Sequence, residues 1–244
     1  MARERNGKRG IAWAWIGAVI LAAGIIAIIF GALLNQQTPI PSPSASPEPP
    51  DSPSALPTVV PGAVVDPSVT DKGWVPEPIT TDANFYIQRA LEAASTFDTQ
   101  LSSREEWLAY LETWFTPDTR YTSEPDRDSA LDAALLELRQ SVVLTEADWD
   151  SLASAKGRVV AALTGAIEDV AVSEDPSGDM RIGTADVALS YTRVDGDGAE
   201  YGYEDRVRVS VQVLCGEGSV PAPGSAQQSG DCKVVRFFAE PMEP

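Results

Sequence analysis

The chain has 244 residues, with 18 Lys and Arg against 36 Asp and Glu, a formal net charge of −18 and no histidine. The lack of imidazole excludes Ser-His-Asp and Cys-His catalysis, H-E-x-x-H zinc sites and His general-base mechanisms. The acidity disfavours direct nucleic acid binding, because phosphate contacts need clustered Lys and Arg.

An unbroken apolar run covers residues 11–34 and follows a basic tail, residues 1–10. A helix of this length rises about 36 Å, enough to cross a hydrocarbon core of ~30 Å. The alternative is a cleaved signal peptide, but the apolar region of such peptides is shorter, about 7 to 15 residues, and the run ends in a poor cleavage site. We therefore predict a single transmembrane helix over 11–34. Basic residues resist translocation, so we expect a cytoplasmic N-terminus and an extracytoplasmic remainder in the cell membrane.

Within this predicted membrane helix, Gly17, Gly24 and Gly31 recur every seven residues. Small residues let helix backbones approach closely, so the stripe is a candidate self-association face. Glycine is also common in membrane helices that do not associate, and this reading stays open.

Residues 35–79 alternate proline with small residues and are predicted to form a disordered linker. Polyproline extends by about 3.1 Å per residue, so the linker could reach roughly 140 Å. Such a length suits crossing a wall layer, although a passive stalk explains the composition equally well.

A helical block follows the linker. Residues 82–97 carry apolar side chains at helical spacing behind a possible Asp82 cap, and residues 103–106 have the sequence of a capping box ahead of an apolar stripe that ends at Thr116-Pro117. Two further helices are predicted over residues 128–140 and 145–157.

Four strands complete the chain, at residues 158–172, 180–194, 201–214 and 233–239. In the third, Val207, Val209, Val211 and Val213 alternate with polar residues, which predicts one buried face and one solvated face. The sequence Asp-Gly-Asp-Gly at 195–198 predicts a hairpin turn. A calcium loop is the alternative, but no Glu stands at the twelfth loop position. Helices followed by antiparallel strands predict one α+β domain, residues 80–244.

The two cysteines, Cys215 and Cys232, both fall in the predicted outer region, and we expect them to form one disulfide. It would tie the end of the third strand to the start of the fourth. Two free thiols are the alternative. Two thiols alone are too few for a metal site, so we expect neither a metal nor a cofactor.

No residue is assigned a catalytic role. An aromatic cluster could line a hydrophobic cavity, but core packing explains it as well and is preferred. Its members are Trp107, Trp114, Phe115, Phe85 and Phe97. Carboxyl and phenol groups could support acid-base chemistry without histidine, yet no spacing singles out a pair. These are Asp186, Tyr191, Tyr201 and Tyr203. We therefore expect a protein that is not an enzyme.

The order of these parts resembles the TcpC-like conjugation proteins of actinobacteria, which are similar to the periplasmic scaffold subunit of type IV secretion systems. The likeness is carried by residues 83–97, 107–117 and 232–238. It implies a cone-shaped roll of the nuclear transport factor two superfamily, with three to four helices packed on a curved antiparallel sheet. Residues 123–157 and the glycine-rich loop before Cys232 depart from the simplest form of that roll.

The resemblance implies a noncatalytic, oligomeric scaffold that contacts other subunits of a membrane complex for DNA transfer. Two alternatives share the fold: an accessory of lipid import similar to the Mce-associated proteins, and an isomerase-like domain that binds a ligand in its cavity. A scaffold predicts a cavity plugged by side chains and an apolar or charged outer patch. A ligand-binding module predicts an open pocket that holds a carboxylate with a shifted pKa.

Overall fold

The computed structural model describes residues 62–142 and 144–242. The predicted cytoplasmic tail, the membrane helix with Gly17, Gly24 and Gly31, and most of the predicted linker lie outside these residues. Within the part that the structure describes, no helix is both long enough and apolar enough to cross a bilayer.

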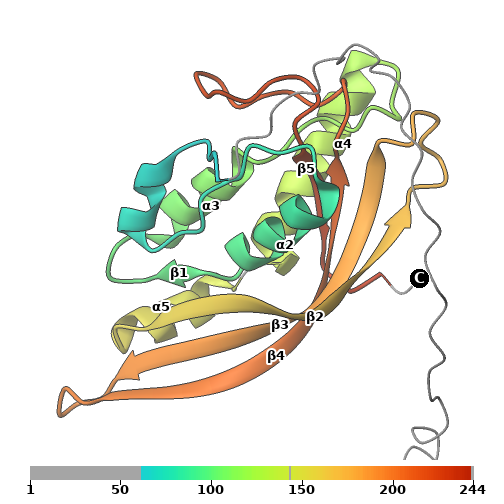
Figure 1. Cartoon of the computed structure of the whole chain (residues 1–244). Helices are drawn as coiled ribbons and strands as arrows, with labels where there is room; N and C mark the ends of the chain where they lie inside the picture. Colours follow the sequence, from blue (N-terminus) through green and yellow to red (C-terminus); the bar gives the residue numbers. More distant parts are fainter. Residues whose placement is uncertain (1–61, 143, 243–244) are drawn as a thin grey trace, which may run out of the picture. The chain divides into compact units, whose positions relative to one another are not determined.

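The sheet has five antiparallel strands in the order β1-β2-β3-β4-β5 (Figure 1). The strands are β1 (Phe97–Asp98), β2 (Arg158–Ala171), β3 (Met180–Val194), β4 (Glu200–Leu214) and β5 (Lys233–Phe238). The four strands predicted from the sequence are confirmed, each with bounds that match to within one residue. The two-residue β1 was missed, because it is too short to show any alternation.

Four α-helices and two short helical turns make up the helical layer. They are η1 (Pro67–Lys72), α2 (Ala83–Ala93), α3 (Arg104–Glu112), α4 (Glu124–Glu137), the π-helical turn η2 (Leu138–Val142) and α5 (Glu146–Ser154). Asp82 caps α2, and the capping box at Ser103 and Glu106 is formed. Helix α4 begins four residues earlier than predicted, because Ser123 caps it and proline is tolerated in a first turn. The α+β fold, with helices packed on a curved antiparallel sheet, is confirmed.

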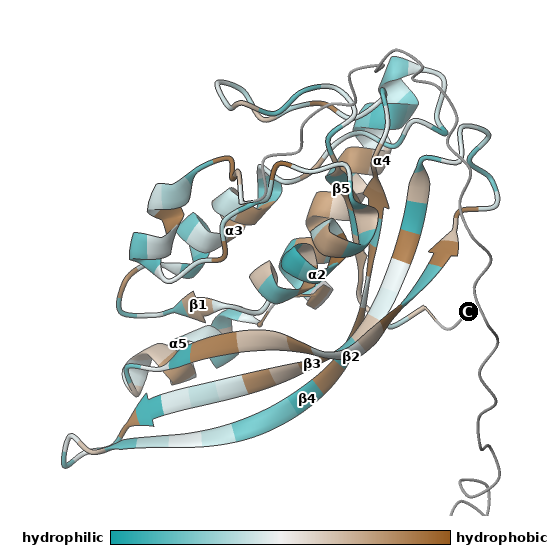
Figure 2. Ribbon diagram, in the orientation of Figure 1, coloured by the Kyte–Doolittle hydropathy of each residue, from teal (hydrophilic) through white to brown (hydrophobic). Residues whose placement is uncertain are grey.

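The main core lies between α2 and the sheet. Val187, Val211 and Val213 are fully buried there, opposite Ile87 of α2. Gly183 of β3 permits this contact, since a Cβ at that position would stand 2.5 Å from Ile87 Cγ2. In Figure 2 the half of β4 nearest to its turn with β3 is white and teal, so that part of the hairpin presents mainly polar residues.

The prediction of one solvated face along β4 fails at the far end of the strand. Ser210 and Gln212, expected to face water, are buried. They are covered because Met180, Leu214 and their neighbours form a second small core, and because the chain returns over this region at Met242, whose backbone hydrogen bonds Ser210 and Thr184. The alternation of residues within β4 does not predict burial by a segment that folds back from the end of the chain.

The predicted boundary between linker and domain at residue 80 is also wrong. Residues 62–79 already belong to the packed domain. Val64 and Pro78 form an isolated antiparallel β-bridge. Trp74 is buried, with its ring centroid 4.9 Å from that of Tyr110, and its indole N–H donates to Ser102 Oγ at 3.0 Å. Proline content favoured the linker prediction, but the apolar side chains of this segment find partners on α3.

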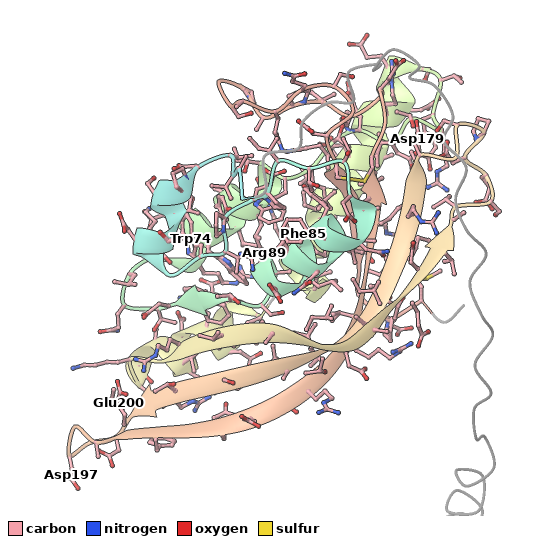
Figure 3. The ribbon with its side chains drawn as sticks, viewed as in Figure 1. Trp74, Phe85, Arg89, Asp179, Asp197 and Glu200 are labelled. Atoms are coloured by element: carbon pink, nitrogen blue, oxygen red, sulfur yellow. A yellow bond between two sulfur atoms is a disulfide. The ribbon has the colours of Figure 1, made fainter. Side chains whose placement is uncertain are left out.

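Two local predictions are confirmed. The sequence at 195–198 forms the β3–β4 hairpin turn, with Asp197 at its tip (Figure 3). Asp195 Oδ1 accepts from the N–H groups of Asp197 and Ala199. Cys215 and Cys232 form a disulfide that joins the end of β4 to the start of β5.

Candidate functional site

A cavity of about 290 Å³ opens between the end of α2 and the inner face of the sheet. Its wall is mostly apolar. It comes from the residues just after α2, from β1, α3, η2 and the segment before α5, from strands β2 to β4, and from Ala239 after β5. The lining residues are Ala94, Ser95, Phe97, Trp107, Val142, Leu144, Val159, Leu189, Tyr191, Val207, Arg208, Val209 and Ala239. The space between the end of α2 and the curved sheet is therefore not filled completely by the described side chains.

Three aromatic rings pack together beside this cavity, and two of them, Phe97 and Trp107, line it. Phe97 lies 4.8 Å from Trp107 and 4.6 Å from Trp149, measured between ring centroids. Trp107 is 1% exposed, and its Nε1 has no hydrogen-bond partner among the described residues. A buried indole N–H normally finds an acceptor, so this group is unusual for a buried polar atom.

The aromatic cluster predicted from the sequence is confirmed only in part. Trp107, Trp114, Phe115 and Phe97 are buried, as expected for core packing, and two of them also line the cavity. Phe85 is 43% exposed at the start of α2 and does not belong to the cluster (Figure 3). Trp149 of α5 takes part instead. Sequence spacing does not reveal which helices meet, so a residue from α5 could not be added to the cluster.

The described lining of the cavity contains no carboxylate. Arg208 is its one charged residue, and it forms an ion pair with Glu168 at 2.8 Å. Burial raises the pKa of Tyr191, which keeps that phenol protonated. A carboxylate general base of the isomerase type is therefore not placed in this cavity by the described residues.

The other acid-base candidates lie elsewhere. Asp186 stands 3.6 Å from Arg208 in a partly exposed ion pair. Tyr203 stacks on Tyr191 with ring centroids 4.5 Å apart, and Tyr201 is exposed near the hairpin turn. The structure thus brings two of the tyrosines together, but no carboxylate among the described residues is hydrogen-bonded to either phenol.

A buried ion pair forms a second polar centre. Lys233 Nζ lies 2.8 Å from Glu77 Oε1, and both side chains are 1% exposed. Glu77 Oε1 also accepts from Tyr86 Oη at 2.7 Å and from Gln227 Nε2 at 3.1 Å, while Lys233 Nζ donates to the carbonyl of Thr113 at 2.8 Å. Glu77 Oε2 has no partner among the described residues.

Burial sets the protonation behaviour of this centre. Desolvation lowers the pKa of Lys233, and the neighbouring Glu77 carboxylate opposes that shift. Desolvation also raises the pKa of Tyr86 well above its usual value, with a further upward contribution from Glu77. The tyrosine therefore remains a hydrogen-bond donor to Glu77 at any physiological pH.

Sequence reasoning missed this centre. Glu77 stands in the stretch predicted as linker, and Lys233 seemed to be an ordinary strand residue next to Cys232. A lysine directly before two valines at the start of a strand was the available signal, since lysine is almost never fully buried without a partner. Its partner lies 156 residues away and could not be identified from sequence spacing.

The outer surface also has a hollow of about 270 Å³ between α4 and β5. Charged pairs flank it, with Arg120 contacting Asp118 at 2.6 Å and Arg236 contacting Glu137 at 2.6 Å. Leu136 on α4 is exposed nearby in sequence. This face combines charges with an exposed apolar side chain, as protein contact surfaces do.

Comparisons with known proteins give fold-level likenesses only. No protein-family model and no curated protein matches the chain. An IcmL-like type IV secretion system protein from Legionella pneumophila subsp. pneumophila str. Philadelphia 1 is similar in structure, with a TM-score of 0.36 and 13% identity over 64% of this chain and 88% of that chain. A periplasmic fragment of TraM is similar with a TM-score of 0.29 and 14% identity over 62% of this chain and 89% of that chain. At these scores the two likenesses assign no function.

Proposed function

We propose that the chain is a noncatalytic, membrane-anchored scaffold subunit of a conjugative, type IV secretion-like apparatus for DNA transfer. It acts through protein contacts of an extracytoplasmic domain of the nuclear transport factor two type. One observation carries the scaffold role: the segment that enters the domain from the predicted linker is fixed to it by the buried Glu77–Lys233 pair. The resemblance to TcpC-like proteins suggests the kind of apparatus.

The physical argument concerns how the tether meets the domain. A linker that only delivers a domain to some distance needs no buried polar joint at its end. Here Glu77 reaches α2 through Tyr86, the β4–β5 loop through Gln227 and β5 through Lys233. Removing one partner of a buried ion pair costs about 3–5 kcal/mol, so the joint holds the entering segment in one register. A segment held in one register keeps the domain surface around its entry point in one shape, which suits a subunit that must present given faces to its neighbours.

Charge and anchoring complete the proposal. Residues 1–10 contain four of the 18 basic residues and one of the 36 acidic residues. Residues 11–244 therefore contain 14 basic and 35 acidic residues, a formal net charge of −21. This balance favours contacts with other proteins of a membrane complex over contacts with DNA. Residues 11–34 would supply the anchor, and Gly17, Gly24 and Gly31 would supply a face for homo-oligomerisation.

The test combines a mating assay with crosslinking. We expect deletion of the gene to abolish DNA transfer from donor cells, and the wild-type chain to restore it. Mild crosslinking of the tagged full chain, followed by mass spectrometry, should recover channel subunits of the transfer apparatus. Normal transfer from deletion cells would refute the proposal, and recovery of lipid-import proteins instead would redirect it.

The apolar cavity favours one alternative, an accessory of a lipid-import system of the Mce-associated type. In this role the anchor, the linker and the outer domain would be the same, but the protein would belong to a lipid-import complex and not to a DNA-transfer complex. Deletion would then impair lipid uptake and leave DNA transfer intact.

A further inference from the structure

We propose that the edge of β4 between Glu200 and Arg206 is a docking surface, and that it binds an extended, Lys- or Arg-rich segment of another protein as an added β-strand. The scaffold role leaves open which surface makes contacts and what chemistry the partner has. The proposal rests on that role only in taking a protein as the occupant, and its test does not depend on DNA transfer.

Strand β4 is longer than its neighbour β5, so part of one edge lacks a partner strand. β5 pairs with Ser210–Leu214 of β4, whereas the stretch from Glu200 to Arg206 pairs, among the described residues, with β3 alone. Proteins commonly protect such an edge with proline, lysine or a β-bulge. This stretch contains neither proline nor lysine, and its pairing with β3 has no register shift. It is therefore a template on which a further strand can form.

The register shows which backbone groups point to this edge. The N–H of Asp195 donates to the carbonyl of Ala199 at 3.0 Å, so these two residues form a hydrogen-bonded pair, and hydrogen-bonded pairs recur at every second position of the hairpin. Gly202 and Glu204 fall in the alternate pairs, and their N–H and C=O groups therefore point away from β3. Arg206 belongs to the same set, and its N–H indeed donates to the carboxylate of the residue before it, at 2.8 Å.

The side chains along the edge set the chemistry of the partner. Tyr201 and Tyr203 are 48% and 43% exposed, and a tyrosine ring attracts a cation over its face. From the hairpin turn to residue 205 the sequence has no Lys or Arg, and Figure 3 shows two of its carboxylates at the end of the hairpin. The acidic residues of this stretch are Asp195, Asp197, Glu200, Glu204 and Asp205. Basic side chains on an added strand would lie beside these carboxylates and rings.

The same charges disfavour a second copy of this chain as the occupant. Two copies of this edge, paired with each other, would bring two sets of carboxylates together, and like charges on neighbouring strands are destabilising. Glu204 and Asp205 have no ion pair within the described part of the chain, so a basic partner would meet charges that are not already neutralised. Charge complementarity therefore selects a basic segment of a different protein.

The test uses the isotope-labelled full chain in nanodiscs of phosphatidylcholine, which has no net charge and does not attract a basic peptide. The probe is the peptide acetyl-Thr-Lys-Thr-Lys-Thr-Lys-Thr-amide, and its control has Glu in place of Lys. We expect the lysine peptide to slow hydrogen exchange at the amides of Gly202 and Glu204 by at least about tenfold, because these N–H groups gain acceptors. The amide of Tyr203, which faces β3, should change little, and the glutamate peptide should have no effect.

Variants of Glu204 separate the backbone edge from the charge. Glu204→Gln removes the charge alone and should weaken binding of the lysine peptide about two- to threefold. Glu204→Pro also removes the N–H at the free edge, which the pairing with β3 does not need, and should weaken binding by at least about tenfold. Glu204→Lys should weaken binding more than Glu204→Gln does, whereas the matched Asp128→Lys, at an exposed position of α4, should leave binding nearly unchanged.

Four results would each overturn the proposal. They are no binding of the lysine peptide, unchanged exchange at Gly202 and Glu204 when it binds, equal affinity of Glu204→Pro and Glu204→Gln, and equal losses in Glu204→Lys and Asp128→Lys. Any of these, found while deletion of the gene still abolishes DNA transfer, would reject the docking edge and leave the scaffold role standing. Binding at this edge with normal transfer from deletion cells would reject the scaffold role alone.

Discussion

Replacing Lys233 with methionine tests the buried centre directly. Lys233 and Glu77 are each 1% exposed, so solvent screens their attraction very little. In Lys233→Met the Glu77 carboxylate would keep its hydrogen bonds from Tyr86 and Gln227 but would lose the only cation within contact distance in the described structure. A buried charge left in this way is strongly unfavourable.

The expected loss of stability follows from that geometry. Removing one member of a buried ion pair costs about 3–5 kcal/mol, and 1 kcal/mol shifts the melting temperature by about 2–4 °C for a chain of this size. Lys233→Met should therefore lower the melting temperature by roughly 6–20 °C. The double variant Glu77→Gln/Lys233→Met removes both charges, and it should recover most of the loss because the amide oxygen still accepts from Tyr86 and Gln227.

Urea unfolding of the full chain, followed by tryptophan fluorescence, measures the differences in the free energy of unfolding between the wild-type chain and these variants. Lys72→Met is the matched control, since Lys72 pairs with Glu106 at 2.9 Å on the exposed surface, and we expect no measurable change of the midpoint. The reasoning would be refuted if Lys233→Met lost no more stability than Lys72→Met, or if the double variant were less stable than Lys233→Met alone.

Three further outcomes are expected. Burial raises the pKa of Tyr86 and Tyr110, so above about pH 10 the unfolded chain releases these protons while the folded chain keeps them. The stability of the fold should therefore decrease as the pH rises above this value. Parallel titration of tyrosinate absorbance and circular dichroism should show ionisation of these two groups only on unfolding. Gly183→Ala, whose Cβ would clash with Ile87, should cost about 1–3 kcal/mol in urea unfolding, while Gly196→Ala in open space at the hairpin turn should cost far less, and equal losses would contradict the close packing of α2. Reducing the disulfide, which closes a sequence separation of 17 residues, should cost ~3 kcal/mol, and an unchanged urea midpoint under reductant would speak against it.

The strands could be predicted closely because their signals are local. Strand β3 begins and ends at the predicted residues, Met180 and Val194, since an extended apolar run is followed at once by the Asp-Gly turn. The same holds for the capping box of α3, in which both partners lie within one helical turn.

The candidate sites could be predicted much less well, because they depend on contacts between distant segments. Phe97 continues the helical spacing predicted over residues 82–97, yet it is buried beyond the end of α2, where the chain has turned into β1. Phe85, which was grouped with it only as an aromatic residue, is exposed. Trp149 approaches from α5 and completes the ring stack. Periodicity gives the apolar side of each element but not which elements meet.

The buried pair also explains how the entering segment and the disulfide support each other. Cys232 and Lys233 are consecutive at the start of β5: the first is bonded to Cys215 and donates its N–H to the carbonyl of Thr80 at 2.7 Å, and the second holds Glu77. Two consecutive residues are therefore held by different bonds: the disulfide joins Cys232 to the end of β4, and the ion pair joins Lys233 to the segment before α2. If the chain is tethered as we propose, a pull on that segment reaches β5 and, through the disulfide, β4, as well as α2 and α3 through Tyr86 and Tyr110. The position of these ties suits a domain that must keep its shape while attached to a long linker.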